Sequence, residues 1–259
     1  MSHKKLILGF NWKSNPVSPA QSRLLFEKYL EQDVANNLEV IVFPPSLYLS
    51  DFYLNYPFEL KFKKIKLGTQ KIASVDSGTG FLTAELAHSV GAQYTIINHS
   101  ETKNIYKISF PEIQKQIQKA SSVGIKSIVC ISYSKIENSH TQISEDLKDI
   151  FGNLGVDPLD IIVAFEPSNF IGTDNAMSVE NIHHFVDFIR VCLNDLGYNS
   201  TKILYGGGIN SKNIEELAQV HSLSGFLIGH SSLESDELTK IIAKLSHFPV
   251  DAEVENHPH

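Results

Sequence analysis

The chain of 259 residues is poor in the residues that hold disulfide-rich or zinc-stabilised folds together. It has two cysteines, Cys130 and Cys192, both in apolar surroundings and neither in a C-x-x-C pair, so we expect neither a disulfide framework nor a zinc site. It also lacks an excess of positive charge, since 22 lysines and arginines stand against 29 aspartates and glutamates, a net charge of −7. Without a lysine- or arginine-rich run, the chain is a poor candidate for nucleic-acid binding.

Long hydrophobic runs are absent as well. No apolar stretch approaches the length that spans a bilayer, and a strand-like run begins at Leu6, which leaves no room for a signal peptide before it. Hydrophobic residues make up 42% and charged residues 20% of the chain, the balance of an ordinary globular protein. We therefore predict a cytoplasmic protein with neither a membrane nor a nucleic-acid partner.

Eight short apolar segments, rich in Ile, Val, Leu, Phe and Tyr, recur along the chain. Near-continuous apolar runs of this length are typical of parallel strands that are covered on both faces. The segments are Leu6–Phe10, Leu38–Phe43, Ile65–Gln70, Tyr94–Asn98, Ser127–Ile131, Ile161–Phe165, Ile203–Tyr205 and Gly225–Ile228.

Segments with helical periodicity separate these strands, among them Pro19–Tyr29, Pro111–Val123 and Ser178–Leu193. Serines mark several of the expected helix starts, as caps or first-turn residues. The candidates are Ser18, Ser144, Ser178, Ser211 and Ser235. Strand and helix alternate about every 30 residues, as β/α units do.

A closed (β/α)8 barrel uses about 250 residues in this alternation. The alternative α/β architecture is a doubly wound open sheet, which normally carries a glycine-rich phosphate turn after its first strand; here that turn reads Asn11-Trp12-Lys13-Ser14-Asn15. We therefore predict a single (β/α)8 TIM barrel, one catalytic domain over residues 1–249, with a frayed C-terminal tail at residues 250–259.

Polar residues follow several of the predicted strands, at the end where functional groups of such barrels gather. Asn11 and Lys13 follow the first strand, His99 the fourth and Glu166 the sixth. A carboxylate at the barrel mouth can remove a proton next to a carbonyl while a lysine and a histidine stabilise the developing oxyanion. Because His99 precedes a short helix, we expect the helix dipole to lower its pKa and keep the ring neutral. A solvated carboxylate and a buried structural histidine are the simpler alternatives.

Two glycine turns follow the last two strands, Gly206–Gly208 and Gly229 with His230. Glycine turns that lead into helices expose backbone N–H groups and favour a phosphate, and in this fold phosphate sites recur after strands seven and eight. Each turn by itself is equally compatible with a merely tight bend, but the two together favour phosphate.

Ordered motifs at these strand ends resemble a known family. They are Phe10–Asn15, Ile96–Glu101, Ala164–Pro167, Ile171–Thr173, Tyr205–Gly208 and Gly225–Gly229. In this order they resemble the triosephosphate isomerase family, and the similarity extends over nearly the whole chain. The resemblance implies a cytoplasmic enzyme of glycolysis and gluconeogenesis that interconverts dihydroxyacetone phosphate and D-glyceraldehyde 3-phosphate through an enediolate, without a metal or cofactor.

The resemblance also implies a role for each side chain of the catalytic set. Glu166 would carry the proton between the two carbons, and His99 would polarise the carbonyl. Lys13 would stabilise the enediolate, Asn11 would orient Lys13 and contact the substrate, and Glu101 would support the site from behind.

Two further assignments follow from the same resemblance. Backbone N–H groups would hold the phosphate, those of Gly172, Gly208, Gly229 and His230. The family likeness further implies a homodimer, in which the segment Lys71–Ala84 reaches into the partner subunit and places Thr83 near its active site.

The sequence departs from the family pattern mainly around the active-site lid. The lid tryptophan of the family and the glutamate that it bonds are replaced by Asn169 and Tyr133, and the turn serine and the lid glycine by Gly208 and Asp174. Two lost contacts of about 1 kcal/mol each would shift the lid roughly tenfold or more toward the open state. Asp174 would repel a phosphate unless its carboxylate points outward or meets a lysine. His230 could help the phosphate as a cation or strain the turn.

These departures keep other hypotheses open. The main alternative is a catalytically impaired barrel that acts as a phosphate-ligand-binding or structural protein. A Schiff-base aldolase is disfavoured because Lys202 begins its strand, and a metal-dependent epimerase because only His99 and Glu166 have positions suited to metal ligands.

Overall fold

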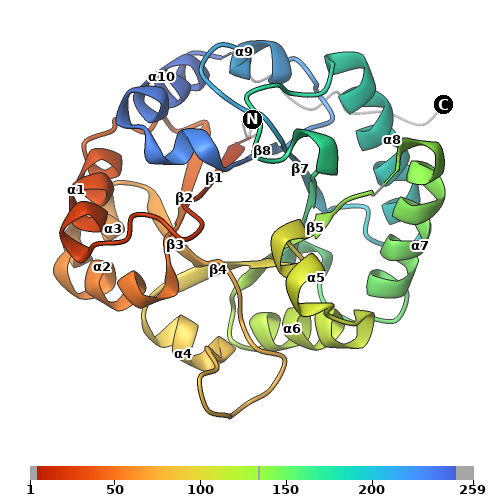
Figure 1. Ribbon diagram of the computed structural model, residues 1–259, viewed down its shortest axis with the longest axis horizontal. Helices are drawn as coiled ribbons and strands as arrows, with labels where there is room; N and C mark the ends of the chain where they lie inside the picture. Colours follow the sequence, from red (N-terminus) through yellow and green to blue (C-terminus); the bar gives the residue numbers. More distant parts are fainter. Residues whose placement is uncertain (1–4, 134, 249–259) are drawn as a thin grey trace.

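Eight parallel strands form a closed barrel in the computed structural model, which describes residues 5–133 and 135–248 (Figure 1). The strands follow one another in sequence order, and the barrel closes where β1 pairs with β8. Their bounds are β1 Leu6–Asn11, β2 Leu38–Phe43, β3 Ile65–Thr69, β4 Ala92–Ile97, β5 Lys126–Ile131, β6 Ile161–Phe165, β7 Lys202–Gly206 and β8 Gly225–Ile228. The predicted (β/α)8 barrel is confirmed, and each predicted strand overlaps an observed one. Residues 250–259, predicted as a frayed tail, lie outside the described residues.

Helices surround the barrel on its outer side (Figure 1). The α-helices are α1 Pro19–Leu30, α2 Leu49–Asn55, α3 Pro57–Phe62, α4 Ala84–Ser89, α5 Ser100–Tyr106, α6 Phe110–Ser122, α7 Ser139–Phe151, α8 Val179–Asp195, α9 Ile214–Leu217 and α10 Ser235–Ser246. Short 3₁₀ helices lie between them at η1 Ser46–Tyr48, η2 Ile136–Asn138, η3 Pro158–Asp160, η4 Ser168–Phe170 and η5 His230–Leu233. In residues 5–133 and 135–248, no helix is both long enough and apolar enough to cross a bilayer.

The apolar character of the strands follows from burial on both faces. Ile7, Ile162 and Leu227 belong to a cluster inside the barrel, whereas Leu8 and Phe226, next to two of them along their strands, pack outward against the helices. Because successive side chains of a strand point to opposite faces, neither face reaches solvent and both must be apolar. The same alternation applies at the ends of the strands. A residue that follows a strand in an inward-facing position therefore projects into the barrel mouth.

Three of the predicted helix starts are right and two are wrong. Ser18 and Ser178 cap α1 and α8 by accepting a hydrogen bond from a backbone N–H in the first turn, and Ser235 is the first residue of α10. Ser144 instead lies inside α7, which begins at Ser139. Ser211 does not cap a helix either, because its backbone N–H and its hydroxyl both donate to the carboxylate of Glu237, at 2.7 and 2.8 Å.

Candidate active site

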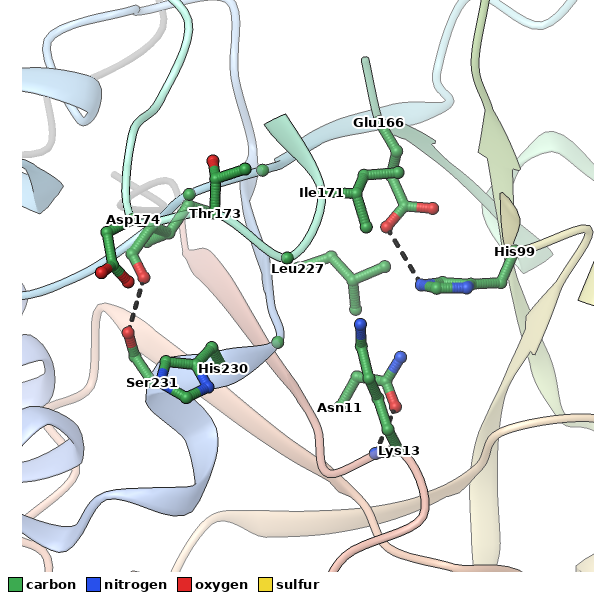
Figure 2. A pocket seen from close by; sticks show the side chains of 15 residues that line it. Asn11, Lys13, His99, Glu166, Ile171, Thr173, Asp174, Leu227, His230 and Ser231 are labelled. Carbon is green, nitrogen blue, oxygen red and sulfur yellow. Dashed lines mark hydrogen bonds and ion pairs between the residues drawn. The ribbon is translucent and has the colours of Figure 1, made fainter. Parts of the chain in front are cut away.

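One pocket at the carboxyl ends of the strands gathers the side chains expected to carry chemistry (Figure 2). Asn11, Lys13, His99 and Glu166 all line it, although they come from three separate strand ends. Asn11 and Glu166 continue the inward-facing series of β1 and β6, so the pleat of each strand turns them toward the barrel interior. Both are buried, as is His99.

The backbone around Lys13 is held in an unusual conformation. Lys13 has a φ of 55°, in the left-handed region that side chains with a Cβ rarely occupy. Its backbone N–H donates to Asn11 Oδ1 at 3.0 Å, and its carbonyl accepts from Gln70 Nε2 at 2.7 Å. Gln70 also donates to the carbonyl of Phe43 at 2.9 Å, so one amide joins the ends of β1 and β2. These bonds fix where the lysine side chain starts.

The ammonium group of Lys13 has a carboxylate partner outside the pocket. Lys13 Nζ lies 2.7 Å from Glu101 Oε1, and the Glu101 side chain is 50% exposed. Glu101 belongs to the first turn of α5 and is not among the residues that line the pocket. That Glu101 supports the site from behind stays a prediction; in the structure its carboxylate pairs with Lys13 from outside the pocket.

His99 carries its proton on the nitrogen that faces the pocket. Its Nδ1 accepts a hydrogen bond from the backbone N–H of Glu101 at 3.3 Å, which leaves the proton of the neutral ring on Nε2. Nε2 lies 3.4 Å from Glu166 Oε1. This orientation lets the ring donate toward the centre of the pocket.

The expected lowering of the His99 pKa is wrong for this arrangement. Burial of the ring is the largest single influence and lowers the pKa, but the carboxylates of Glu166 and Glu101 together raise it, and the net pKa lies above the usual value of histidine. The reverse holds for Glu166: burial is the largest single influence and raises its pKa, but His99, Cys130 and Lys13 together lower it, and the net pKa lies below the usual value. The acid is therefore ionised and available as a base near neutral pH.

The four residues expected to hold a phosphate line the other end of the same pocket: Gly172, Gly208, Gly229 and His230. Gly208 has a φ of 57°, and a Cβ at this position would lie 1.9 Å from the carbonyl oxygen of Asn175. Only glycine fits at position 208 without a shift of the Asn175 backbone, because the left-handed conformation disfavours a side chain and the Asn175 carbonyl occupies the space that the side chain would need.

Two residues whose effect on a phosphate was uncertain can now be placed. The His230 side chain is 66% exposed and its Nε2 lies 3.4 Å from Glu234 Oε1, so it points to a carboxylate partner. The residue sits in a 3₁₀ helix, without the left-handed backbone that would strain the turn. Asp174 lines the pocket at the end opposite His99 and Glu166 (Figure 2).

Residues 167–177, here called the lid, cover the pocket with contacts of this chain's own. Ser168 Oγ donates to the carbonyl of Tyr133 at 2.8 Å, and the N–H of Met177 donates to the hydroxyl of Tyr205 at 3.0 Å. Between these ends, Asn210 Nδ2 donates to the carbonyl of Asp174 at 2.9 Å. The lid is thus tied to the barrel at both ends and in the middle.

The side chains of Tyr133 and Asn169, which stand where the family pattern has a bonded glutamate and tryptophan, do not bond each other. Tyr133 is buried and packs against Phe165 and Phe185, with ring centroids 6.2 and 5.4 Å apart. The Asn169 side chain forms no hydrogen bond within the described part of the chain. Ser168, one residue before Asn169, instead reaches the backbone of Tyr133.

Sequence reasoning missed several residues of the site. Leu227 and Ser231 line the pocket, and Gln70 fixes the backbone of Lys13. Leu227 was detectable as an inward position of β8 and Ser231 as the residue after a glycine turn. Nothing in the sequence pointed to Gln70, because its function depends on the left-handed backbone of a residue 57 positions away.

The segment Lys71–Ala84, which connects β3 to α4, projects from the rim of the barrel (Figure 1). It exposes apolar surface, with Phe81 53% exposed, and beside it Tyr106 is 62% exposed with Lys71 Nζ 3.7 Å from its ring centroid. Thr83 is buried and caps α4 by accepting from the N–H of Leu86 at 3.3 Å. Its hydroxyl is therefore engaged within its own chain.

Comparison with known proteins gives one consistent result. A family model described as triosephosphate isomerase matches residues 6–245. A triosephosphate isomerase of Francisella philomiragia is 31% identical over 250 residues, covering 92% of this chain and 96% of the relative. That of Pseudoalteromonas translucida is 31% identical over 252 residues, covering 93% and 97%. That of Colwellia psychrerythraea is 26% identical over 249 residues, covering 92% and 96%.

Proposed function

The chain belongs to the triosephosphate isomerase family, and on that basis we propose that it interconverts dihydroxyacetone phosphate and D-glyceraldehyde 3-phosphate. The observation that carries the proposal is the shared pocket. One end holds an amine, an imidazole and a carboxylate, and residues of the glycine turns line the other end. This matches a small substrate with a carbonyl at one end and a phosphate at the other.

Glu166 is the proposed base. Its carboxylate removes a proton from C1 of dihydroxyacetone phosphate; the electrons of the broken C–H bond form the C1–C2 double bond, and the carbonyl oxygen takes up the negative charge. The carboxylic acid then returns the proton to C2, while a proton moves between the two oxygens. Atoms and charge balance without any other reactant. The lowered pKa of Glu166 supports this role because the base starts ionised.

His99 and Lys13 are proposed to stabilise the enediolate. The Nε2 proton of His99, which points to Glu166 Oε1 at 3.4 Å, would be donated to the substrate oxygen when substrate enters between them. Lys13 adds a positive charge from the opposite wall of the pocket (Figure 2). Fixed donors of this kind cost no reorganisation as the charge develops.

Backbone N–H groups of Gly172, Gly208, Gly229 and His230 are proposed to bind the phosphate. Because the His230 side chain is paired with Glu234, its backbone and not its ring is the proposed ligand. The negative charge of Asp174 at this end would weaken phosphate binding, and we propose that the lid anchors offset part of this cost.

Two measurements test the proposal against a barrel that binds phosphate ligands without catalysis. A coupled assay should show turnover with either triose phosphate. Phosphoglycolate, which has a phosphate and a carboxylate, should raise the unfolding temperature. Turnover together with stabilisation supports the isomerase. Stabilisation without turnover supports the binding protein, and the absence of both turnover and stabilisation contradicts both hypotheses.

We further propose a homodimer that joins through the segment Lys71–Ala84. Its exposed apolar side chains, together with those of α4 and α5, form the kind of surface that a partner subunit covers. Light scattering should give twice the chain mass, and Phe81→Asp should shift the population to monomer. A wild-type protein that is monomeric at micromolar concentration would contradict this proposal.

A further inference from the structure

A pair of histidines outside the active site joins two of the outer helices. His140 is the second residue of α7 and His184 lies in the second turn of α8, and these helices lie side by side (Figure 1). Their Nε2 atoms are 2.9 Å apart. Neither residue lines the pocket described above, so the pair has no part in the proposed isomerase reaction.

Aromatic packing fixes the ring of His140. It stacks on Phe185, with centroids 5.1 Å apart and planes 23° apart, and meets Phe188 edge-on at 4.6 Å. The ring therefore presents its Nε2 edge to His184, whose own ring is exposed. A ligand from solvent can reach both nitrogens, and one of the two is already held in place.

The separation of the two nitrogens fits a shared metal ion. Imidazole nitrogens bind zinc at about 2.0–2.1 Å, so two of them on one ion lie about 2.9 Å apart at a right angle and about 3.4 Å apart at a tetrahedral angle. The observed 2.9 Å is the short end of this range. A small rotation of the exposed His184 ring would turn both lone pairs toward one ion.

We propose that His140 and His184 bind one divalent transition-metal ion, with zinc as the representative case, and that the ion links α7 to α8. On binding, the ring that donates from Nε2 in this contact carries its proton on Nδ1 instead, through exchange with water, so that both Nε2 lone pairs go to the ion and neither ring becomes an imidazolate. Within residues 5–133 and 135–248 there is no group of three or more histidine, cysteine, aspartate or glutamate side chains arranged to hold a metal. Water completes the coordination, and the site is an open, exchangeable one.

His183 provides a matched control on the same helix. It adjoins His184, is exposed, and its Nδ1 lies 2.9 Å from Asp187 Oδ2 one turn further along α8. It has a partner within its own helix and no histidine opposite it across the α7–α8 contact in the described residues. Its loss should not affect an ion bound between the helices.

Zinc titration by calorimetry on the full chain tests the site, with His140→Gln, His184→Gln and His183→Gln beside the wild type. The chain has eleven histidines, so the informative quantity is the difference between variants, because other zinc binding is common to all. We expect His140→Gln and His184→Gln each to lose the same one equivalent of zinc, and His183→Gln to retain it. Equal stoichiometry in all four proteins would overturn the proposal, as would an equal loss in His183→Gln.

Thermal unfolding tests the link between the helices independently. Excess zinc should raise the unfolding temperature of the wild type and of His183→Gln by at least about 2 °C relative to chelator, and should leave His184→Gln unchanged. His140→Gln also removes the ring contacts with Phe185 and Phe188 and lowers stability for that reason. His184 is exposed, so His184→Gln keeps the test valid. A zinc-induced rise in His184→Gln equal to that of the wild type would overturn the proposal.

Discussion

The catalytic end of the pocket and the lid that covers it have diverged to different degrees. At the catalytic end, Asn11, Lys13, His99 and Glu166 stand where the family resemblance places them, and the barrel brings them together. In the lid, the resemblance implies that the latch residues of the family are replaced, and hydrogen bonds of Ser168 and Asn210 hold the lid to the barrel. The two regions differ in the atoms that define them: the catalytic end depends on side-chain functional groups, whereas two of the three lid anchors use backbone atoms of the lid, the N–H of Met177 and the carbonyl of Asp174.

The largest effect should come from the carboxylate at the catalytic end. Glu166→Gln keeps the shape but removes the base, and we expect kcat to fall by at least about 10²–10⁴-fold. Steady-state assays with both triose phosphates measure this, and unchanged phosphoglycolate stabilisation controls for folding. Near-normal turnover in this variant would contradict the proposal that Glu166 is the base.

Lys13 and Glu101 form one ion pair but should differ in effect. Lys13→Met removes a charge from the pocket wall and should lower kcat/KM by about 10²–10³-fold. Glu101→Gln, which changes a half-exposed side chain outside the pocket, should lower it much less. Equal losses would mean that the ion pair, and not the cation, is what the site requires.

Introducing at position 208 the serine of the family pattern should displace the lid. Because a Cβ at Gly208 would lie 1.9 Å from the Asn175 carbonyl, Gly208→Ser should displace the lid and not repair a latch. We expect phosphoglycolate to bind at least about fivefold more weakly, the cost of about 1 kcal/mol for a left-handed non-glycine residue. Tighter binding in Gly208→Ser would show that the lid can use the family's contact after all.

Smaller effects should come from the new lid anchors. Ser168→Ala removes one hydrogen bond of the lid, worth about 1 kcal/mol, and should raise the release of methylglyoxal per isomerisation by about fivefold because the enediolate is less well enclosed. Asn210→Ala removes the bond to the Asp174 carbonyl together with two bonds in its own turn, to the Gly208 carbonyl and from the Lys212 N–H, and should raise the release at least as much. Asn169→Ala is the matched control within the lid. Equal leakage in all three variants would show that these contacts do not hold the lid closed.

The smallest predicted change is a pKa. Glu166 raises the pKa of His99, so Glu166→Gln should lower the pKa of the ring and favour the neutral form. NMR titration of the His99 ring in both proteins measures the direction. A pKa that stays the same or rises would contradict the proposed contact between the two groups.

The sequence predicted the barrel well because its strands are buried on both faces. Continuous apolar runs such as Ile161–Phe165 are typical of strands covered on both faces of an α/β fold. The strand ends then place Lys13, His99 and Glu166 on one rim of the barrel. Helix starts were less predictable. Ser144 and Ser211 both have a hydroxyl that could cap a helix, but Ser144 lies inside α7 and the Ser211 hydroxyl donates to Glu237.

What the sequence could not give depends on contacts between distant segments. The pKa of His99 was expected to be lowered by its own helix, yet the carboxylate of Glu166, 67 residues away, is the main influence that raises it. The lid was expected to be weakened because the family's contacts are gone. Its replacement anchors, such as Asn210 to the Asp174 carbonyl, use backbone acceptors that leave no pattern in the sequence.

Hydrogen exchange with solvent during turnover tests the central claim most directly. In deuterium oxide, wild-type protein should place deuterium at the substrate carbon that receives the proton from Glu166, which NMR of the triose phosphates detects. We predict that Glu166→Gln leaves this carbon unlabelled beyond the uncatalysed rate while phosphoglycolate still stabilises the variant. Labelling by Glu166→Gln at the wild-type rate would contradict the account.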